Sequence, residues 1–242
     1  MKESLFEIRE NRPLTKEVFE MVLSGDTSAI TAPGQFVNIR LDGLFLRRPI
    51  SVFDAEPGEL KLLYKVVGKG TEQMSTLRPG RQLDLLTGLG NGYDLTVSGG
   101  TPLLLGGGAG IPPLYLLAKR LLSQNKRVTC VLGFNTAGEV FAEQAFRDTG
   151  AEVILTTADG SRGKKGFVTD ALPDEYSYFY TCGPEPMLRA VYRATVTGGQ
   201  FSFEERMGCG FGACMGCSCR TVTGYKRICR DGPVLRKEEI LW

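Results

Sequence analysis

Histidine is absent from this 242-residue chain, and tryptophan occurs only once. Zinc sites often combine histidine with cysteine, so any soft metal here would have to be held by cysteine. The net charge of +2, without a basic stripe interleaved with aromatic residues, gives no reason to expect nucleic acid as a partner. The N-terminus has scattered charges and lacks the apolar core of a signal peptide, which favours a cytoplasmic protein with reduced thiols.

Charged residues are missing over 18 consecutive positions, Thr101–Ala118. That length meets the threshold for a membrane-spanning helix. Gly106–Gly108, Gly110, Pro112 and Pro113 interrupt the run, however, and such residues break helices. A buried strand, a glycine turn and the start of a helix explain the stretch better, so we expect no membrane segment.

Five of the seven cysteines lie within 21 residues near the C-terminus. Cys209, Cys214 and Cys217 have the spacing C-x4-C-x2-C, and Cys229 follows 12 residues later. This is the plant-type ferredoxin order for a [2Fe–2S] cluster, in which one loop supplies three thiolates and a later residue supplies the fourth. The glycines between them suit a loop that must wrap around a cluster. The spacing therefore predicts a protein that transfers electrons.

Other roles for these cysteines are open at this point. Structural zinc usually takes two separated C-x2-C pairs or uses histidine, and the chain has one such pair and no histidine. A disulfide framework is typical of small secreted domains, which this chain does not resemble. Cys219 is surplus to the spacing, and is either a buried neighbour of the cluster or a substitute ligand.

Three segments of the chain have different patterns, and we expect each to be a domain or module. Residues 1–97 contain short strands separated by Pro-Gly pairs, which favours an antiparallel barrel or sandwich. Residues 98–199 alternate strands with helices and predict a doubly wound parallel sheet. Residues 200–242 are too short for a core of their own, so the cluster itself is expected to organise them. The terminal Trp242 packs either on a partner or on its own domain.

Two loops of the second segment fall where ligands bind in such sheets, beyond the carboxyl ends of the strands. The first is the turn Gly106–Gly110, between the strand from Thr101 and a helix with apolar positions Leu114, Leu117 and Leu121. The second follows a strand at Tyr178–Thr181. The first turn does not fit G-x-G-x-x-G, so alone it is either a phosphate-binding turn or a plain connection.

The combination of motifs is more specific than any one of them. Arg47-Arg48-Pro49-Ile50-Ser51 resembles the Arg-x-x-Ser flavin motif of the ferredoxin-reductase superfamily, and Gly107–Gly110 and Cys182-Gly-Pro184 resemble its nicotinamide-nucleotide loops. With the cysteine loop after Glu205-Arg-Met-Gly, the whole chain resembles the electron-transfer subunits of NAD-dependent (class B) dihydroorotate dehydrogenase. The 11 residues between the third and fourth cysteines are fewer than in many relatives.

The resemblance implies an FAD-binding barrel, an NAD-binding α/β domain and a [2Fe–2S] module, in that order. It implies that Arg48 meets the FAD pyrophosphate and that the Ser51 hydroxyl meets the isoalloxazine edge. It also implies a flavin-lining strand, a phosphate turn, a nucleotide site and a metal site. For the flavin, the residues are Pro49 and Ile50 within the motif, Leu63, Tyr64 and Lys65 on the strand, and Gly70 and Thr71 in the phosphate turn. For NAD, they are Gly107, Gly108, Gly110, Cys182 and Gly183. For the metal, they are Cys209, Cys214, Cys217 and Cys229.

The resemblance further implies an electron relay without catalytic acid–base residues of its own. A separate FMN-containing dihydroorotate dehydrogenase catalytic subunit would supply the electrons for pyrimidine biosynthesis, in a heterotetramer of two plus two chains. The alternatives are the same scaffold serving a ferredoxin–NADP reductase or a sulfide- or hydrogen-metabolising complex, and a flavin-free redox sensor. NAD and NADP are not distinguished by the sequence.

Overall fold

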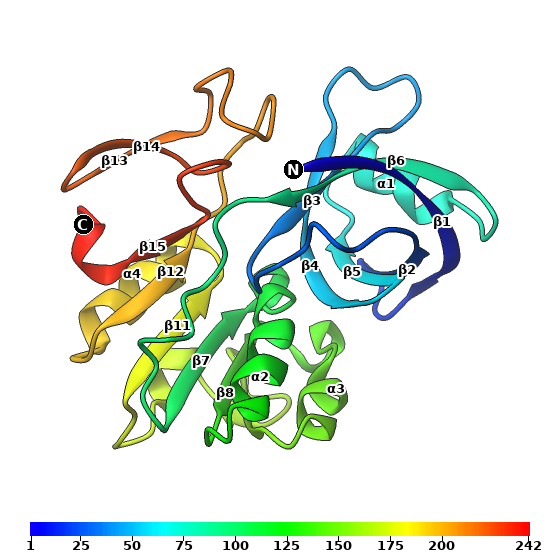
Figure 1. Cartoon of the computed structure of the whole chain (residues 1–242). Helices are drawn as coiled ribbons and strands as arrows, with labels where there is room; N and C mark the ends of the chain where they lie inside the picture. Colours follow the sequence, from blue (N-terminus) through cyan, green and yellow to red (C-terminus); the bar gives the residue numbers. More distant parts are fainter.

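Six antiparallel strands close a barrel over the first part of the chain (Figure 1). The computed structural model describes residues 1–242. The barrel order is β1-β2-β5-β4-β3-β6. Its elements are β1 (Lys2–Pro13), β2 (Val18–Ser24), β3 (Phe36–Ile39), β4 (Arg48–Glu56), β5 (Glu59–Lys65), α1 (Lys69–Thr76) and β6 (Gln82–Leu89). The structure thus resolves the choice between barrel and sandwich in favour of the barrel.

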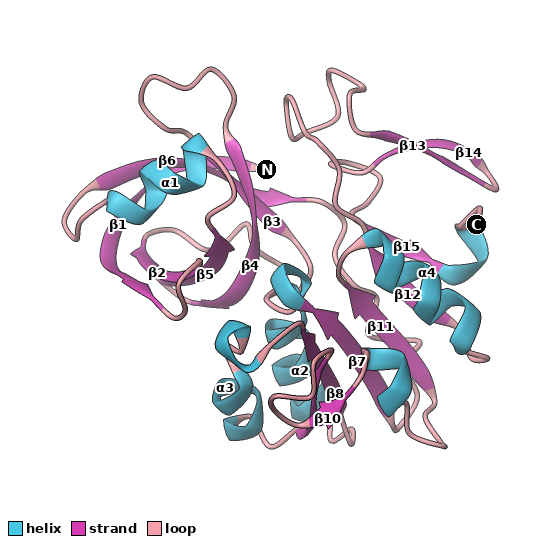
Figure 2. Ribbon diagram, turned by 180° about the vertical axis from the view of Figure 1, so that it is seen from behind, coloured by secondary structure: helices cyan, strands magenta, loops and turns pink.

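A seven-stranded sheet in the order β10-β9-β8-β7-β11-β12-β15 follows the barrel. All neighbouring strands are parallel except β15, which runs antiparallel to β12. Figure 2 shows the helices on both sides of this sheet, as a doubly wound fold requires. The strands are β7 (Pro102–Gly107), β8 (Thr129–Phe134), β9 (Glu152–Thr157), β10 (Lys164–Lys165), β11 (Tyr178–Cys182), β12 (Gly199–Ser202) and β15 (Val234–Arg236), and the α-helices are α2 (Pro113–Ser123), α3 (Glu143–Asp148) and α4 (Glu185–Ala194).

Alternation along the sheet strands explains the two covered faces. Leu104 on β7 belongs to a core shared with α2 and α3, whereas Leu103 and Leu105 face the opposite core, which includes α4. The uncharged run Thr101–Ala118 is strand β7, a short 3-10 turn (Gly108–Gly110) and the first half of α2. No helix in the chain combines the length and the apolar character that crossing a membrane requires.

The helical region between β8 and β9 is divided in two. A 3-10 turn (Ala137–Glu139) comes first, and α3 begins only at Glu143. Ala142 between them has a φ of 57°, a left-handed conformation that a continuous helix excludes. The chain has two further 3-10 turns, Val168–Ala171 and Lys237–Glu239.

The C-terminal part is more than a metal-bound loop, contrary to the expectation that the cluster alone organises it. It contains the hairpin β13 (Ser218–Thr221) and β14 (Gly224–Arg227), and then returns to the main sheet through β15. Ile228, Leu235 and Ile240 share an apolar core with Phe179 and Phe201 of the parallel sheet. The expected boundary between residues 199 and 200 falls inside β12. Apolar packing with the sheet therefore stabilises this part as well.

Trp242 packs on its own domain, which settles the choice left open by the sequence. Its ring lies 5.4 Å from that of Tyr192 and 5.5 Å from that of Phe201, both edge-on. The guanidinium of Arg189 lies over the same ring at 5.3 Å. The C-terminus thus closes the outer end of α4 against β12.

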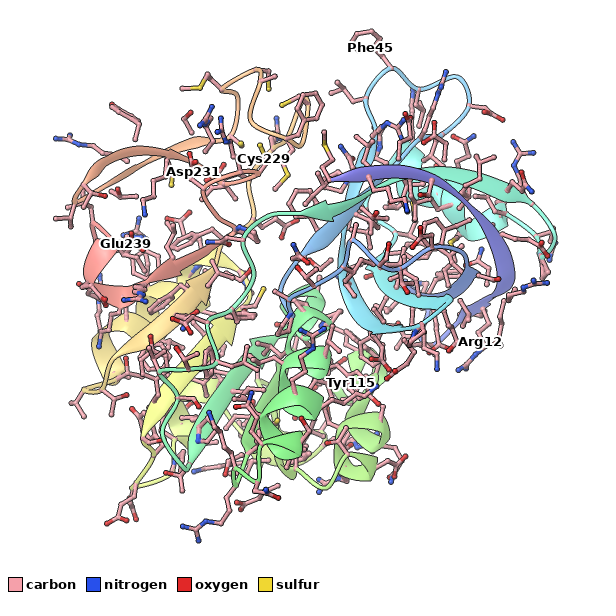
Figure 3. All side chains as sticks on the ribbon, viewed as in Figure 1. Arg12, Phe45, Tyr115, Cys229, Asp231 and Glu239 are labelled. Carbon is pink, nitrogen blue, oxygen red and sulfur yellow. The ribbon has the colours of Figure 1, made fainter.

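Helix α2 joins the barrel to the parallel sheet. The ring of Tyr115, labelled in Figure 3, stacks on Phe53 of β4 with centroids 4.1 Å apart. One turn later, the ammonium group of Lys119 contacts both carboxylate oxygens of Asp54 at 2.8 Å and Glu56 at 2.7 Å. The helix that follows the glycine turn is therefore fixed to the strand that carries the Arg48–Ser51 motif.

Candidate flavin, nucleotide and iron–sulfur sites

The cysteine loop is folded around sulfur by backbone N–H groups. The amides of Ala213 and Cys214 point to the sulfur of Cys209 at 3.2 and 3.4 Å, and the amide of Cys209 points to the sulfur of Cys214 at 3.5 Å. Burial alone would raise the pKa of the Cys209 thiol, but these backbone donors outweigh it and lower the pKa to about 6. The loop therefore favours the thiolate that metal binding needs.

Cys217 and Cys229 form a second, buried pair. The amide of Cys229 donates to the sulfur of Cys217 at 3.4 Å. Burial, followed by the proximity of Cys217, raises the pKa of Cys229 to about 12. The guanidinium of Arg227, two positions before Cys229, donates to the Gly212 carbonyl at 2.8 Å, so the segments that carry the two pairs adjoin. A bound metal would supply the positive charge that ionised thiols need in this apolar setting.

The cysteine arrangement fits a [2Fe–2S] cluster. Cys209 with Cys214, and Cys217 with Cys229, form two pairs of thiols, which match a cluster with four cysteine ligands. All seven cysteines are free, which contradicts a disulfide framework. Cys219 lies half-buried on β13, where burial and then Glu205 raise its pKa.

The outer face of the barrel brings the flavin motif beside this loop. In the pairing of β3 with β4, Phe36 lies opposite Ser51 and Asn38 lies opposite Pro49. Directly opposed residues share one face of a sheet. Ile50 between them faces the barrel interior. Phe36 belongs to the same apolar cluster as Cys217 and Cys229, so this face meets the cysteine module.

Arg48 differs from its neighbour Arg47 in its partners. Arg47 pairs with Asp84 at 2.8 Å and with Glu3 at 2.7 Å. Arg48 contacts no carboxylate and donates only to the carbonyls of Leu46 and Arg47. Its uncompensated guanidinium lies at the first turn of α1, against Gly70. The combination is suited to a phosphate group, because a helix N-terminus and a guanidinium both attract anions.

The first turn of α1 depends on Gly70 and Thr71. A side chain at position 70 would collide with the Arg48 guanidinium, so glycine is required for that contact. The Thr71 hydroxyl accepts from the amide of Val67 at 2.9 Å and donates to the carbonyl of Gly68 at 3.1 Å. The resemblance to the family's phosphate turn implied that this hydroxyl donates to phosphate, but its proton already closes the turn. Thr71 thus stabilises the turn from Val67 to Gly68 that leads into α1.

The strand Leu63–Lys65 divides its side chains between two faces. Tyr64 is inside the barrel, where its hydroxyl donates to Asn11 at 2.9 Å. Burial, which outweighs the bond from Asn11, raises its pKa. The resemblance implied that Tyr64 would stack on the flavin or hydrogen-bond to it, but the alternation of the strand turns its side chain inward. Leu63 and Lys65 point out of the barrel, where Leu63 packs in the core shared with α2 and Lys65 lies 3.0 Å from Glu17.

The two nucleotide loops touch at the carboxyl ends of β7 and β11. Cys182 lies opposite Gly106 in this parallel pair. A side chain at Gly110 would collide with the backbone of Cys182 and Gly183, so only glycine allows the loops to meet. Burial raises the pKa of Cys182 to about 12 and keeps its thiol neutral. Gly107 packs equally closely under Met187 of α4.

Comparison with known proteins agrees with this geometry. Residues 204–241 match the family model of the iron–sulfur cluster binding domain of dihydroorotate dehydrogenase B. The dihydroorotate dehydrogenase B (NAD(+)) electron transfer subunit of Geobacillus sp. is 42% identical over 100% of this chain and 99% of its own length. That of Fusobacterium nucleatum is 40% identical over 96% of each. The chain belongs to the dihydroorotate dehydrogenase B electron transfer subunit family.

Solved structures place this electron transfer subunit in the ferredoxin-reductase fold. A structure described as an NADH-dependent reduced ferredoxin–NADP oxidoreductase of flavin-based electron bifurcation has a TM-score of 0.88 at 31% identity. It covers 98% of this chain and 90% of its own. A ferredoxin NADP+ reductase from Neisseria gonorrhoeae has a TM-score of 0.69 at 17% identity, over 80% of this chain and 90% of its own, and shows the fold alone.

Sequence reasoning on this electron transfer subunit missed residues that reach the site from other strands. Asn38 and Phe36 lie in β3, 171 or more positions before the cysteines they approach. Met187 covers the glycine turn from α4. The run Phe36–Ile39 alternates with Val37 and Ile39 inside the barrel, which could have marked Asn38 as outward-facing. Nothing in the sequence showed what it would face.

Proposed function

We propose that this electron transfer subunit carries electrons from the FMN of a dihydroorotate dehydrogenase catalytic subunit, through a [2Fe–2S] cluster and FAD, to NAD+. The observation that carries the proposal is the outer face shared by β3 and β4. Pro49 and Ser51 of the flavin motif lie on it beside Asn38 and Phe36, which adjoin the cysteine loop. A flavin at the motif and a cluster in the loop would be neighbours.

For the cluster, the ligands we propose are Cys209 and Cys214 on one side and Cys217 and Cys229 on the other. The N–H groups directed at Cys209, Cys214 and Cys217 support this set, because donors to sulfur stabilise thiolates. Arg227 adds a link between the two halves, since its guanidinium donates to the Gly212 carbonyl at 2.8 Å.

For FAD, we propose that Arg48 and the first turn of α1 at Gly70 hold the pyrophosphate. The free charge of Arg48 supports this role. Ser51 would hydrogen-bond the isoalloxazine edge, with Pro49 and Ile50 keeping the strand extended. Leu63 and Lys65, which point outward, would line the flavin, and Tyr64 would contribute only backbone. Thr71 would act indirectly, by holding the turn at the start of α1 in shape.

For NAD, we propose that the turn at Gly107, Gly108 and Gly110 receives the pyrophosphate at the start of α2. The three glycines of the turn and the helix N-terminus behind it support this placement. Cys182 and Gly183 would lie near the nicotinamide. A neutral, partly buried thiol there would keep a negative charge away from the hydride path.

The flavin supplies the conversion between one-electron and two-electron transfer, because it accepts electrons singly and delivers two as a hydride. The chain's own contribution is to bind and orient the cofactors. Histidine is absent, which agrees with proton chemistry on dihydroorotate taking place in the catalytic subunit.

Exposed apolar side chains support a partner surface around the cysteine loop. Phe45, at the tip of the β3–β4 loop, is 100% exposed, and Phe211 and Met215 of the cysteine loop are half exposed. Both loops project from the same end of the molecule (Figures 1 and 3). We propose that the catalytic subunit covers them, in a heterotetramer of two plus two chains. Aromatic anchors of this kind dominate many interfaces.

The test is anaerobic visible absorbance of the complex before and after addition of dihydroorotate. Bleaching of the flavin and iron–sulfur bands, reversed by NAD+, is the expected result. Bleaching by NADH or NADPH alone would retain the relay but reassign its partner. A complex without flavin or iron–sulfur absorbance would refute the proposed function.

A further inference from the structure

Asn38 is the barrel's point of contact with the cysteine loop. It is 1% exposed, and its side-chain amide donates to the Cys209 carbonyl at 3.2 Å. This is the only hydrogen bond between the barrel strands and the loop 207–216. Gly210, the next residue of the loop, has a φ of 80° and lies directly against the same amide, where a side chain would collide. The loop is therefore shaped to fit Asn38.

The same residue is built into the flavin side of the barrel. Asn38 lies opposite Pro49 in the β3–β4 pairing, and Phe36, two positions earlier, lies opposite Ser51. Its own backbone carbonyl accepts from Arg47, which precedes Arg48. One residue thus contacts the loop that carries Cys209 and belongs to the strand pair that carries the flavin motif.

The other half of the Asn38 side chain has an unusual environment. Its carbonyl oxygen is buried without any hydrogen-bond partner in the protein. A buried polar atom left unpaired is unfavourable, and apolar side chains avoid that cost. Apolar residues occupy neighbouring positions on the same face, Phe36 and Pro49. Packing alone therefore does not explain an asparagine at position 38.

We propose that Asn38 is a positioning residue for electron transfer between the cluster and the flavin. Its amide holds the Cys209 end of the loop against β3. This contact would fix the distance between the two cofactors and place a polar group between them. The inference rests on the proposed function, because it requires both cofactors. With NADH as the reductant the relay would run in the direction opposite to the proposed one: NADH would give the flavin two electrons as a hydride, and these would pass one at a time to the cluster and on to the FMN of the catalytic subunit.

The test compares Asn38→Leu with the unmodified complex by anaerobic stopped-flow absorbance with NADH as the reductant. Flavin reduction should keep its rate and its KM for NADH, because the nucleotide loops are untouched. Cluster reduction should slow about tenfold, since small displacements of reacting groups have large effects on rate. The electron paramagnetic resonance spectrum of the reduced cluster should also shift, because the hydrogen bond to a ligand's backbone is lost.

Asn91→Ser is the matched control. Asn91 also ties the C-terminal part to the chain that leaves the barrel, through the carbonyls of Asp231 and Val234, but it does not contact the loop 207–216. It should leave the cluster spectrum and both reduction rates unchanged. Equal changes in the two variants would show a general loosening and would overturn the inference.

Asn38→Asp covers the case in which the leucine variant assembles poorly. The carboxylate has nearly the same shape, cannot donate to the Cys209 carbonyl, and brings negative charge toward the cluster. We expect slower cluster reduction and a lower midpoint potential, by 59 mV for each tenfold change in the one-electron equilibrium. Native rates and potential in the fraction that retains its cluster would confine Asn38 to assembly and overturn the inference. Absence of cofactor bands in the unmodified complex would instead refute the proposed function.

Discussion

The ring of Tyr115 on α2 lies parallel to the ring of Phe53 on β4, with an interplanar angle of 15°. Helix α2 begins directly after the glycine turn, and β4 begins with the flavin motif. A single aromatic contact therefore joins the element that would receive NAD to the element that would receive FAD. The ion pair of Lys119 with Asp54 lies beside it.

Tyr115→Leu should loosen this joint. We expect a loss of about 1 kcal/mol in the free energy of unfolding, since a stacked aromatic pair contributes about that much beyond its buried area. Reduction of the flavin by NADH should slow, because the two sites are no longer held in one orientation. Urea denaturation and stopped-flow absorbance measure the two effects. Tyr225→Leu, at an exposed tyrosine of β14, is the control and should change neither.

Arg48→Gln should weaken FAD binding by about 10- to 100-fold, because a charge-assisted bond contributes about 1.5–3 kcal/mol. Titration of the flavin-free protein with FAD, followed by fluorescence, gives the dissociation constant. Arg47→Gln is the matched control, since its guanidinium is already paired with Asp84 and Glu3. It should lower barrel stability with little effect on FAD affinity. Equal losses of affinity would rule out a special role for Arg48.

The thiols of the cluster-free protein should differ in reactivity with pH. The lowered pKa of Cys209, about 6, means that its thiolate predominates at pH 7 and disappears as the pH falls below about 6. Cys229, raised to about 12, remains protonated throughout. Alkylation at pH 7 followed by mass spectrometry should label Cys209 well before Cys229. The reverse order would contradict the N–H···S geometry of the loop.

The lowered pKa of Cys209 also affects the stability of the cluster-free loop. Because the folded pKa of Cys209 lies below the value of about 8.5 for a free thiol, ionisation favours the folded loop. That contribution is fully present above about pH 8.5 and is lost as the pH falls through 6. The cluster-free loop should therefore be more protected from proteolysis at pH 8.5 than at pH 5.5. The cleavage rates are corrected for the pH dependence of the protease itself. Equal corrected rates at the two pH values would contradict this prediction.

Phe45→Ser should weaken the complex with the catalytic subunit about tenfold, the effect of losing an aromatic anchor of roughly 1.4 kcal/mol. Isothermal titration calorimetry of the two subunits gives the affinity. Val196→Ser is the control, because Val196 is also highly exposed but follows α4, away from the cysteine loop. An unchanged affinity for Phe45→Ser would remove the β3–β4 loop from the interface.

Local patterns predicted the alternation of strands and helices, the glycine turn and the cysteine loop, because each depends on residues close in sequence. Long-range pairing decided the rest. The inward direction of Tyr64 follows from the register of β5 with its neighbours, and the return of β15 to the sheet follows from its pairing with β12. Asn38 and Cys209 are 171 positions apart, and only closure of the barrel brings them together.

The segment that carries the cysteines leaves the sheet at Ser202 and re-enters it at Val234, and these two residues are directly paired. Its ends are therefore adjacent, so the segment resembles an insertion at one point of a reductase fold. Insertions whose ends lie close together disturb a host fold little. A shorter connection could close the same gap, and the barrel and sheet would keep their flavin and nucleotide surfaces. Gain or loss of an iron–sulfur centre in such reductases thus requires change at only one junction.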